Sequence, residues 1–169
     1  MVKANIFLIG FMGTGKSTIL HSLAELLAYK KMDIDQVIAQ RSGMQIPQIF
    51  EQQGEAAFRS MESDILKECQ SQGRHVVACG GGAVLNRDNV KRMKENGVIV
   101  LLTASPETIL ERVKHRDTRP LLNGNMNTAY IKVFFFKQKT AYEWAADITI
   151  ATDNKKPSFI ANEIKGLLA

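Results

Sequence analysis

A glycine-rich run near the N-terminus carries the most specific chemical pattern of the 169-residue chain. Residues 10–17 read Gly-Phe-Met-Gly-Thr-Gly-Lys-Ser and satisfy the spacing Gly-x-x-x-x-Gly-Lys-Ser/Thr. In such a loop the backbone N–H groups surround phosphate oxygens, the lysine reaches the β- and γ-phosphates, and the hydroxyl ligates magnesium. The run therefore predicts that the chain binds a nucleoside triphosphate, with Lys16 on phosphate and Ser17 on Mg2+.

Two carboxylates, Asp33 and Asp35, follow a short segment that we expect to be a strand. Side chains two residues apart on an extended chain project to the same side. One carboxylate of such a pair can hold Mg2+ while the other orients an acceptor hydroxyl for attack. Taken alone, the pair is equally consistent with a helix N-cap and a solvated neighbour.

The elements that must position these residues alternate between strand and helix, which is typical of an α/β fold. Strand-like apolar segments are predicted at 6–9, 31–34, 75–78, 98–103 and 148–151. Helical patterning is predicted at 17–28, 36–41, 46–53, 55–72, 88–95 and 107–115, and again from residue 158. A further helix is predicted between residue 128 and the strand at 148–151. The glycine-rich loop thus stands between a strand and a helix, which is the context its motif requires.

Composition and charge exclude several classes of protein. Hydrophobic residues make up 45% and charged residues 23%, which argues against a disordered chain. No apolar run approaches the roughly 18 residues that span a bilayer, and Cys69 and Cys79 form neither a metal-spaced set nor a disulfide framework. We therefore expect a soluble, cytoplasmic, single-domain protein. Its net charge of +5 lies in residues 85–169 and by itself is compatible with a nucleic acid, a membrane or a phosphorylated ligand.

Five motifs in order resemble the shikimate kinase family over nearly the whole chain. They are the loop at 10–17, Asp33-Ile34-Asp35, Gly54-Glu55-Ala56-Ala57-Phe58-Arg59, Gly80-Gly81-Gly82-Ala83-Val84 and Arg119-Pro120-Leu121-Leu122. The resemblance implies transfer of the γ-phosphoryl group of ATP to the 3-hydroxyl of shikimate, a step toward chorismate and aromatic amino acids. It also implies a P-loop NTPase fold like that of nucleoside monophosphate kinases: a five-stranded parallel sheet flanked by helices in one domain over 1–169, with a mobile lid at about 112–127.

The resemblance further implies a role for each matched position, with ATP and Mg2+ as cofactors. Catalysis falls to Lys16, Asp35 and Arg119, and Mg2+ to Ser17 and Asp33. Shikimate is expected to contact Asp35, Arg59, Gly80, Gly81, Gly82 and the residue at position 138. ATP is expected to contact Gly13, Thr14, Gly15, Lys16, Ser17, Thr18, Arg112, Arg119 and Lys155. We expect a monomer with shikimate as its small-molecule partner and with neither a nucleic acid nor a membrane partner.

One position departs from the family pattern. The family usually carries an arginine four residues before a tyrosine as a second anchor for the shikimate carboxylate, but here Gln138 precedes Tyr142 by four residues. Lys137 or Lys139 could supply a positive charge, but a point charge on a flexible stem does not reproduce a bidentate contact. Losing such a charge-assisted contact costs about 1.5 to 3 kcal/mol. Two alternatives stay open: an ATP-binding protein with an impaired acceptor site, and a related small-metabolite kinase such as a gluconate kinase.

The run around Gln138 is itself unusual. Phe134, Phe135 and Phe136 are consecutive, and three such residues spread around about 200° of a helix, too wide for one core-facing side. One explanation is a locally buried hydrophobic helix. Our sharper hypothesis is that residues 133–143 are foreign to the gene, translated from sequencing-adapter bases within an assembled read. Resequencing an independent clone tests this hypothesis, which fails if the same codons are recovered.

Overall fold

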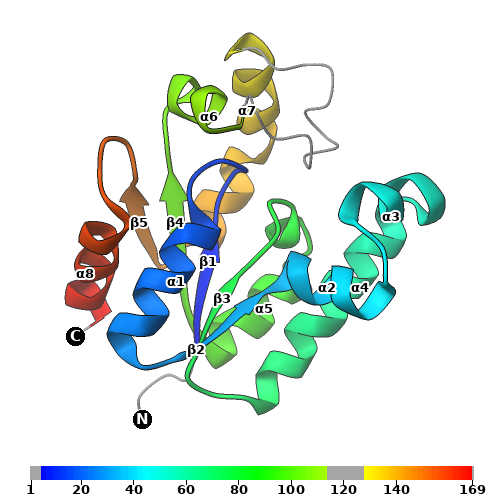
Figure 1. Ribbon diagram of the computed structural model, residues 1–169, viewed down its shortest axis with the longest axis horizontal. Helices are drawn as coiled ribbons and strands as arrows, with labels where there is room; N and C mark the ends of the chain where they lie inside the picture. The colour runs from blue at the N-terminus through cyan, green and yellow to red at the C-terminus, as the bar shows by residue number, and fades with distance from the viewer. Residues whose placement is uncertain (1–4, 114–127, 169) are drawn as a thin grey trace.

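Five parallel strands form the centre of the computed structural model, which describes residues 5–113 and 128–168 (Figure 1). In spatial order they are β2, β3, β1, β4 and β5. All five lie where the sequence predicts strands, which confirms the α/β fold. Their bounds are β1 Asn5–Ile9, β2 Lys30–Asp33, β3 His75–Ala78, β4 Gly97–Thr103 and β5 Ile148–Ala151.

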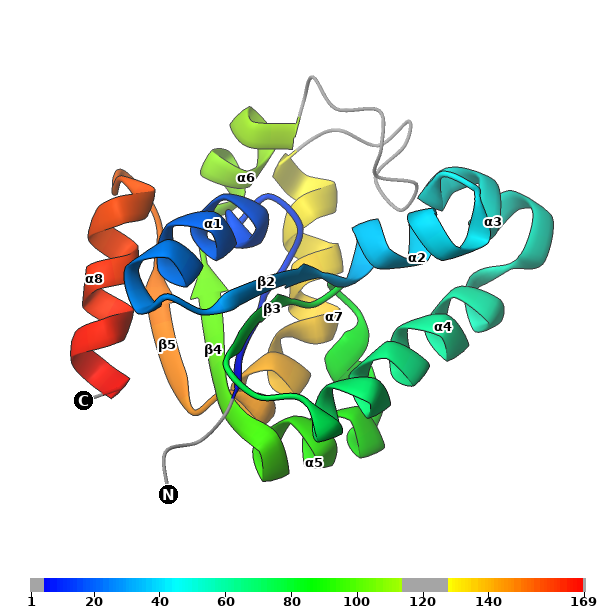
Figure 2. The same ribbon diagram turned by 60° about the horizontal axis from the view of Figure 1, so that its bottom comes forward.

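Strand residues alternate between two apolar cores because successive side chains point to opposite faces of a sheet. In β1, Ile6 and Leu8 join the core under α1 (Lys16–Leu27) and α8 (Pro157–Leu168). Phe7 and Ile9 join the larger core on the opposite face. That core receives residues from α4 (Glu55–Glu68), α5 (Arg87–Asn96), α6 (Pro106–Val113) and α7 (Thr128–Ala145), and the covered faces can be followed in Figure 2. Both faces of the sheet are therefore buried, as parallel sheets require.

Two short helices, α2 (Ile34–Ser42) and α3 (Ile46–Gln53), extend from the β2 edge, at the opposite side of the molecule from α8 in both views. The strand β2 ends at Asp33, one residue earlier than predicted, because the Asp33 side chain caps α2. Its Oδ1 accepts hydrogen bonds from the backbone N–H of Asp35 (3.1 Å) and Gln36 (3.4 Å). Asp35 therefore lies in the first turn of a helix, and our expectation that a strand aligns the two carboxylates was wrong.

One further helix differs in extent from its prediction. The helix predicted at 55–72 ends at Glu68 and continues as a 3-10 turn over Cys69–Ser71. A second 3-10 turn covers Ala83–Leu85. Of the predicted lid at 112–127, only Arg112 and Val113 belong to the described residues, where they end α6. None of the described helices is long and apolar enough to cross a membrane.

Strand order reverses at β1, which lies between β3 and β4. In open α/β sheets, ligands bind beyond the carboxyl ends of the strands at such a reversal. The glycine-rich loop follows β1, Asp33 ends β2, and the triplet Gly80–Gly82 comes soon after β3. The topology therefore brings three of the predicted motifs to one edge of the sheet.

Candidate active site

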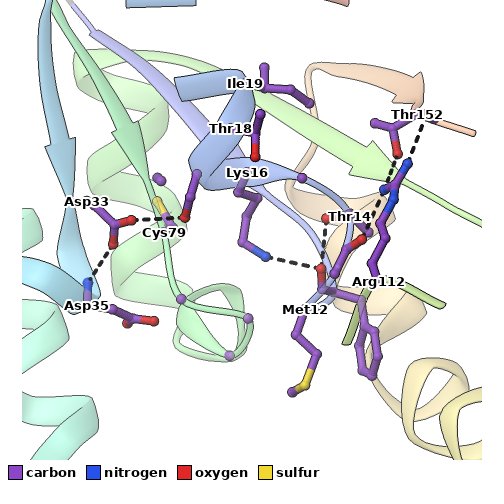
Figure 3. Close-up of a pocket in the computed structure, with 18 of the residues that line it drawn as sticks. Met12, Thr14, Lys16, Thr18, Ile19, Asp33, Asp35, Cys79, Arg112 and Thr152 are labelled. Carbon is purple, nitrogen blue, oxygen red and sulfur yellow. Dashed lines mark hydrogen bonds between the residues drawn. The ribbon is translucent and has the colours of Figure 1, made fainter. Parts of the chain in front are cut away.

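A cavity of about 430 Å³ opens at the carboxyl ends of the strands. Figure 3 shows Asp33 and Asp35 on one side of it, Arg112 and Thr152 on the other, and Lys16 between them. Every predicted site residue except Arg119, which lies outside the described residues, lines this cavity. They are Gly13, Thr14, Gly15, Lys16, Ser17, Thr18, Asp33, Asp35, Arg59, Gly80, Gly81, Gly82, Arg112, Gln138 and Lys155.

The loop after β1 has the backbone shape of a phosphate cradle. Gly15 takes a positive φ of 97° and is the N-cap of α1, where it contributes no side-chain cap to the first turn. Backbone N–H groups at a helix start bind anions in the absence of a side-chain cap. Gly10 cannot carry a side chain, because a Cβ there would overlap the Leu102 carbonyl oxygen. The loop therefore presents donors to the cavity, as predicted for triphosphate binding.

Two loop side chains stabilise the cradle from within. The Thr14 hydroxyl is buried and donates to the Phe11 carbonyl oxygen at 2.7 Å. The Lys16 ammonium donates to the carbonyl oxygens of Gly10 (2.6 Å) and Phe11 (3.1 Å). Thr14 thus contributes to loop shape through its side chain, while Lys16 places a positive charge beside the cradle.

Ser17 and Asp33 bring two oxygen groups together at the mouth of the loop. The Ser17 hydroxyl donates to Asp33 Oδ2 at 3.0 Å. A hydroxyl and a carboxylate suit Mg2+, which binds few protein ligands and keeps waters or substrate phosphate oxygens. Among the described residues no group of three or more His, Cys, Asp or Glu side chains is arranged to hold a metal ion. The oxygen pair therefore fits an ion that arrives together with a phosphate ligand.

Arg112 connects the glycine-rich loop to the segment after β5. Its Nη1 donates to the Gly13 carbonyl oxygen (3.0 Å) and to the Thr152 hydroxyl (3.1 Å), and its Nη2 donates to the Thr152 carbonyl oxygen (3.2 Å). Lys155 forms an ion pair with Glu163 at 3.2 Å and lies over the Phe159 ring. Both cations line the cavity. The hydrogen bonds between Arg112 and Thr152 could not be predicted from the sequence.

The glycine triplet is explained by close packing. A Cβ on Gly80 would overlap the Glu62 carboxylate, and a Cβ on Gly82 would overlap the Arg59 guanidinium. At Gly81 a Cβ would meet only ordinary contacts, the nearest being the Tyr142 hydroxyl at 3.6 Å. Gly80 and Gly82 therefore make room for side chains of α4, while Gly81 leaves space within the cavity.

Arg59 is held between two carboxylates of its own helix. Its Nη2 contacts Glu55 Oε1 at 3.3 Å and its Nη1 contacts Glu62 Oε1 at 3.2 Å. Glu62 is fully buried, and burial is the main cause that raises its pKa to about 7, against the lowering effect of Arg59. Our reading of the sequence missed Glu62, although an i,i+3 spacing from Arg59 on a predicted helix was a signal.

Gln138 lies on α7 and lines the same cavity. The Tyr142 hydroxyl lies 2.6 Å from the Gly81 carbonyl oxygen and 2.8 Å from Gln138 Oε1, and it has one proton to donate between them. Burial raises the Tyr142 pKa above its ordinary value, so this proton is retained at neutral pH. In the same helix the Phe136 side chain is 75% exposed, as expected for one of three consecutive phenylalanines.

A family model described as shikimate kinase matches residues 12–169. A shikimate kinase from Persephonella marina is 43% identical over 162 residues, which cover 96% of this chain and 97% of the relative. A second, from Thermodesulfovibrio yellowstonii, is 41% identical over 160 residues, with 95% and 92% covered.

Solved structures agree with this match. A shikimate kinase from Acinetobacter baumannii in complex with shikimate superposes with a TM-score of 0.93 at 34% identity, covering 98% of this chain and 93% of that one. The enzyme from Aquifex aeolicus gives a TM-score of 0.83 at 36% identity, with 97% and 95% covered. A gluconokinase from Sinorhizobium meliloti, at 16% identity and a TM-score of 0.60 over 99% and 92%, shares the fold alone.

Proposed function

The chain belongs to the shikimate kinase family, and on this basis we propose how its own residues transfer the γ-phosphoryl group of ATP to the 3-hydroxyl of shikimate. One observation carries the proposal: the glycine-rich loop at 10–17 lines the same cavity as Asp35, Arg59 and the glycine triplet. Donor and acceptor can therefore bind in the same cavity, and the transfer yields a phosphorylated product and ADP.

On the donor side, the P-loop N–H groups hold the phosphates and the Lys16 ammonium offsets charge on the transferred group. Arg112 and Lys155, which also line the cavity, bind the nucleotide portion. Arg119 remains our candidate for a further cation on the phosphoryl group, and it lies in the predicted lid outside the described residues.

On the acceptor side, the planar Arg59 guanidinium pairs with the shikimate carboxylate, because its two parallel donors match two carboxylate oxygens. Asp35 accepts the proton of the 3-hydroxyl as that oxygen forms its bond to phosphorus and the bond to ADP breaks. Gly81 leaves room for the substrate to approach the backbone, and Gln138 supplies a neutral polar wall.

Ser17 and Asp33 would hold Mg2+. When bound, the ion neutralises charge on the β- and γ-phosphate oxygens.

We also propose that the chain acts as a cytoplasmic monomer with neither a nucleic acid nor a membrane as its partner. The free, buried thiols of Cys69 and Cys79 suit a reducing compartment. Light scattering coupled to size-exclusion chromatography tests the oligomeric state. A mass of twice the 18.8 kDa chain would contradict the proposed monomer.

A coupled assay of ADP release with shikimate, with gluconate and without acceptor tests the proposed reaction. We expect a shikimate-dependent rate only. ATP binding without turnover at millimolar shikimate would favour the alternative that the acceptor site has decayed at Gln138.

Replacing Asp35 tests the proposed base. Asp35→Asn removes the proton acceptor, so we expect kcat to fall by about 10² or more while the affinity for ATP stays within about twofold. The matched control is Asp64→Asn on α4, where the side chain is 63% exposed. Equal activity of Asp35→Asn and the wild-type chain would exclude Asp35 from the mechanism.

A further inference from the structure

Glu62 combines full burial with an unsatisfied oxygen that lies behind Gly80, a residue that lines the cavity. Its side chain is 1% exposed, and its Oε1 accepts a hydrogen bond from Arg59. Within the described part of the chain its Oε2 has no hydrogen-bond partner. This oxygen packs against Gly80, which lines the cavity. Burial shields an ionised carboxylate here from bulk solvent, and no donor of the described residues reaches its Oε2, so its surroundings favour the protonated form.

Charged and titratable groups act on Glu62 from each element that packs around it. Arg59 and Glu55 of α4 and Asp35 of α2 are the charged neighbours, and only Arg59 favours the ionised form. Cys79 after β3 and Tyr142 of α7 also face it. Burial raises the pKa of both, so they stay neutral around pH 7. Of Glu62, Cys79 and Tyr142, Glu62 is therefore the group that exchanges its proton near neutral pH.

We infer that binding of an anionic acceptor in this cavity is coupled to protonation of Glu62, so that the preference of the site for a carboxylate over a neutral polyol depends on pH. The inference rests on the proposed function, because it takes the shikimate carboxylate as the anion that Arg59 receives. Arg59 is shared: its Nη1 already faces Glu62 at 3.2 Å. A second carboxylate on the same guanidinium places two like charges close together, and like charges favour the neutral form of the group that can take up a proton.

The direction of the effect follows from linkage. Burial sets the Glu62 pKa of the ligand-free protein at about 7, and the bound anion raises it further. Below pH 6 Glu62 is protonated before and after binding, so affinity is highest there and does not vary with pH. As the pH rises through 7, binding must take up a proton and affinity falls.

Isothermal titration calorimetry of the full chain with shikimate measures both the affinity and the proton uptake. The titrations use buffers of different ionisation enthalpy between about pH 6 and 8.5. We expect uptake of up to about one proton per shikimate near pH 7.5 and an affinity loss of about tenfold or more across the range. The methyl ester of shikimate, which is neutral, should bind without proton uptake.

Two variants test whether Glu62 is the group that takes up the proton. Glu62→Gln keeps a neutral side chain of the same size, so its affinity should become independent of pH and its proton uptake should disappear. Glu55→Gln removes the other, exposed partner of Arg59 and should keep both the proton uptake and the pH slope.

The outcomes separate this inference from the proposed function. Shikimate binding with no proton uptake in the wild-type chain, or with uptake that persists in Glu62→Gln, overturns the inference and leaves the proposed function standing. Absence of shikimate binding at every pH overturns both.

Discussion

At the scale of single residues, binding of the acceptor carboxylate depends on the Arg59 guanidinium, which already forms ion pairs within the protein. Arg59 contacts Glu55 and Glu62. Gln138 lines the same cavity, and its neutral amide lies 2.8 Å from the Tyr142 hydroxyl. An anion that enters here competes with two carboxylates for one cation. The absence of a positive charge at position 138 should therefore limit the affinity for the acceptor. Substitutions at this position test that expectation.

We predict that Gln138→Arg lowers the Kd for shikimate by about tenfold or more, because a charge-assisted bidentate contact contributes about 1.5 to 3 kcal/mol. Gln138→Lys should give a smaller gain, since an ammonium lacks the planar fork. Titration calorimetry measures both variants.

The control for the added charge is Thr140→Arg, which places an arginine on the exposed surface of the same helix. Its Kd for shikimate should stay within twofold of the original chain. If Gln138→Arg and the original chain have the same Kd for shikimate, the side chain at position 138 does not contact the acceptor carboxylate.

At the scale of elements, helix ends decide where the site residues lie. Asp33 ends β2 and begins α2 with one side chain, so Asp35 comes into the first helical turn and faces the cavity. Asp153 acts similarly on α6: its Oδ1 accepts hydrogen bonds from the Ser105 N–H (2.9 Å) and the Thr108 hydroxyl (2.7 Å), which lower its pKa. These contacts hold the start of the helix that carries Arg112.

Two exposed glycines allow backbone conformation to be tested without steric contact. Gly43 ends α2 with φ 70°, whereas Gly166 lies inside α8, and a Cβ would meet nothing within 4 Å at either position. We predict that Gly166→Ala stabilises the protein by about 0.5 to 1 kcal/mol. Gly43→Ala should destabilise it by about 1 to 2 kcal/mol, because an L-residue is strained at positive φ.

Urea unfolding followed by circular dichroism measures the free energy of unfolding of both variants. Each serves as the control for the other, since the same side chain is added to both exposed sites. Changes of the same sign would show that backbone conformation is not the deciding difference.

At the scale of the whole molecule, the sheet separates two cores, and both cysteines lie in the larger one. The Cys69 sulfur lies 3.5 Å from the Met32 sulfur, and the Cys79 sulfur lies 3.9 Å from that of Met93. Burial raises the pKa of the Cys69 thiol to about 11 and that of Cys79 well above its ordinary value. The reactive thiolate is therefore scarce in the folded protein at neutral pH.

We predict that Ellman's reagent modifies neither thiol of the native chain at the rate of an exposed cysteine. Both should react at once in denaturing urea, and saturating ATP should slow the native reaction, because a ligand stabilises the folded state. Ser60→Cys, at an exposed position of α4, supplies the fast-reacting control. Rapid modification of two thiols in the native wild-type chain would contradict the buried positions.

The strands and the P-loop could be predicted from the sequence by itself, because hydrophobic periodicity and a phosphate-binding loop are properties of contiguous residues. The motifs at Asp35, Arg59 and Gly80–Gly82 could also be located, and the structure brings all of them to the same cavity. The strand expected to align Asp33 and Asp35 was wrong, because the start of α2 depends on a side-chain cap at Asp33 that competes with strand propensity.

Only the tertiary structure revealed why the acceptor site takes its shape. Glu62 meets Gly80, Arg59 meets Gly82, and Tyr142 meets Gly81 across large separations in sequence. Nor could the chain order show that Arg112 joins the P-loop to Thr152. Such contacts arise when separate strands place their carboxyl ends at one edge of the sheet. Burial there, which depends on every surrounding element, then decides the charge state of a side chain such as Glu62.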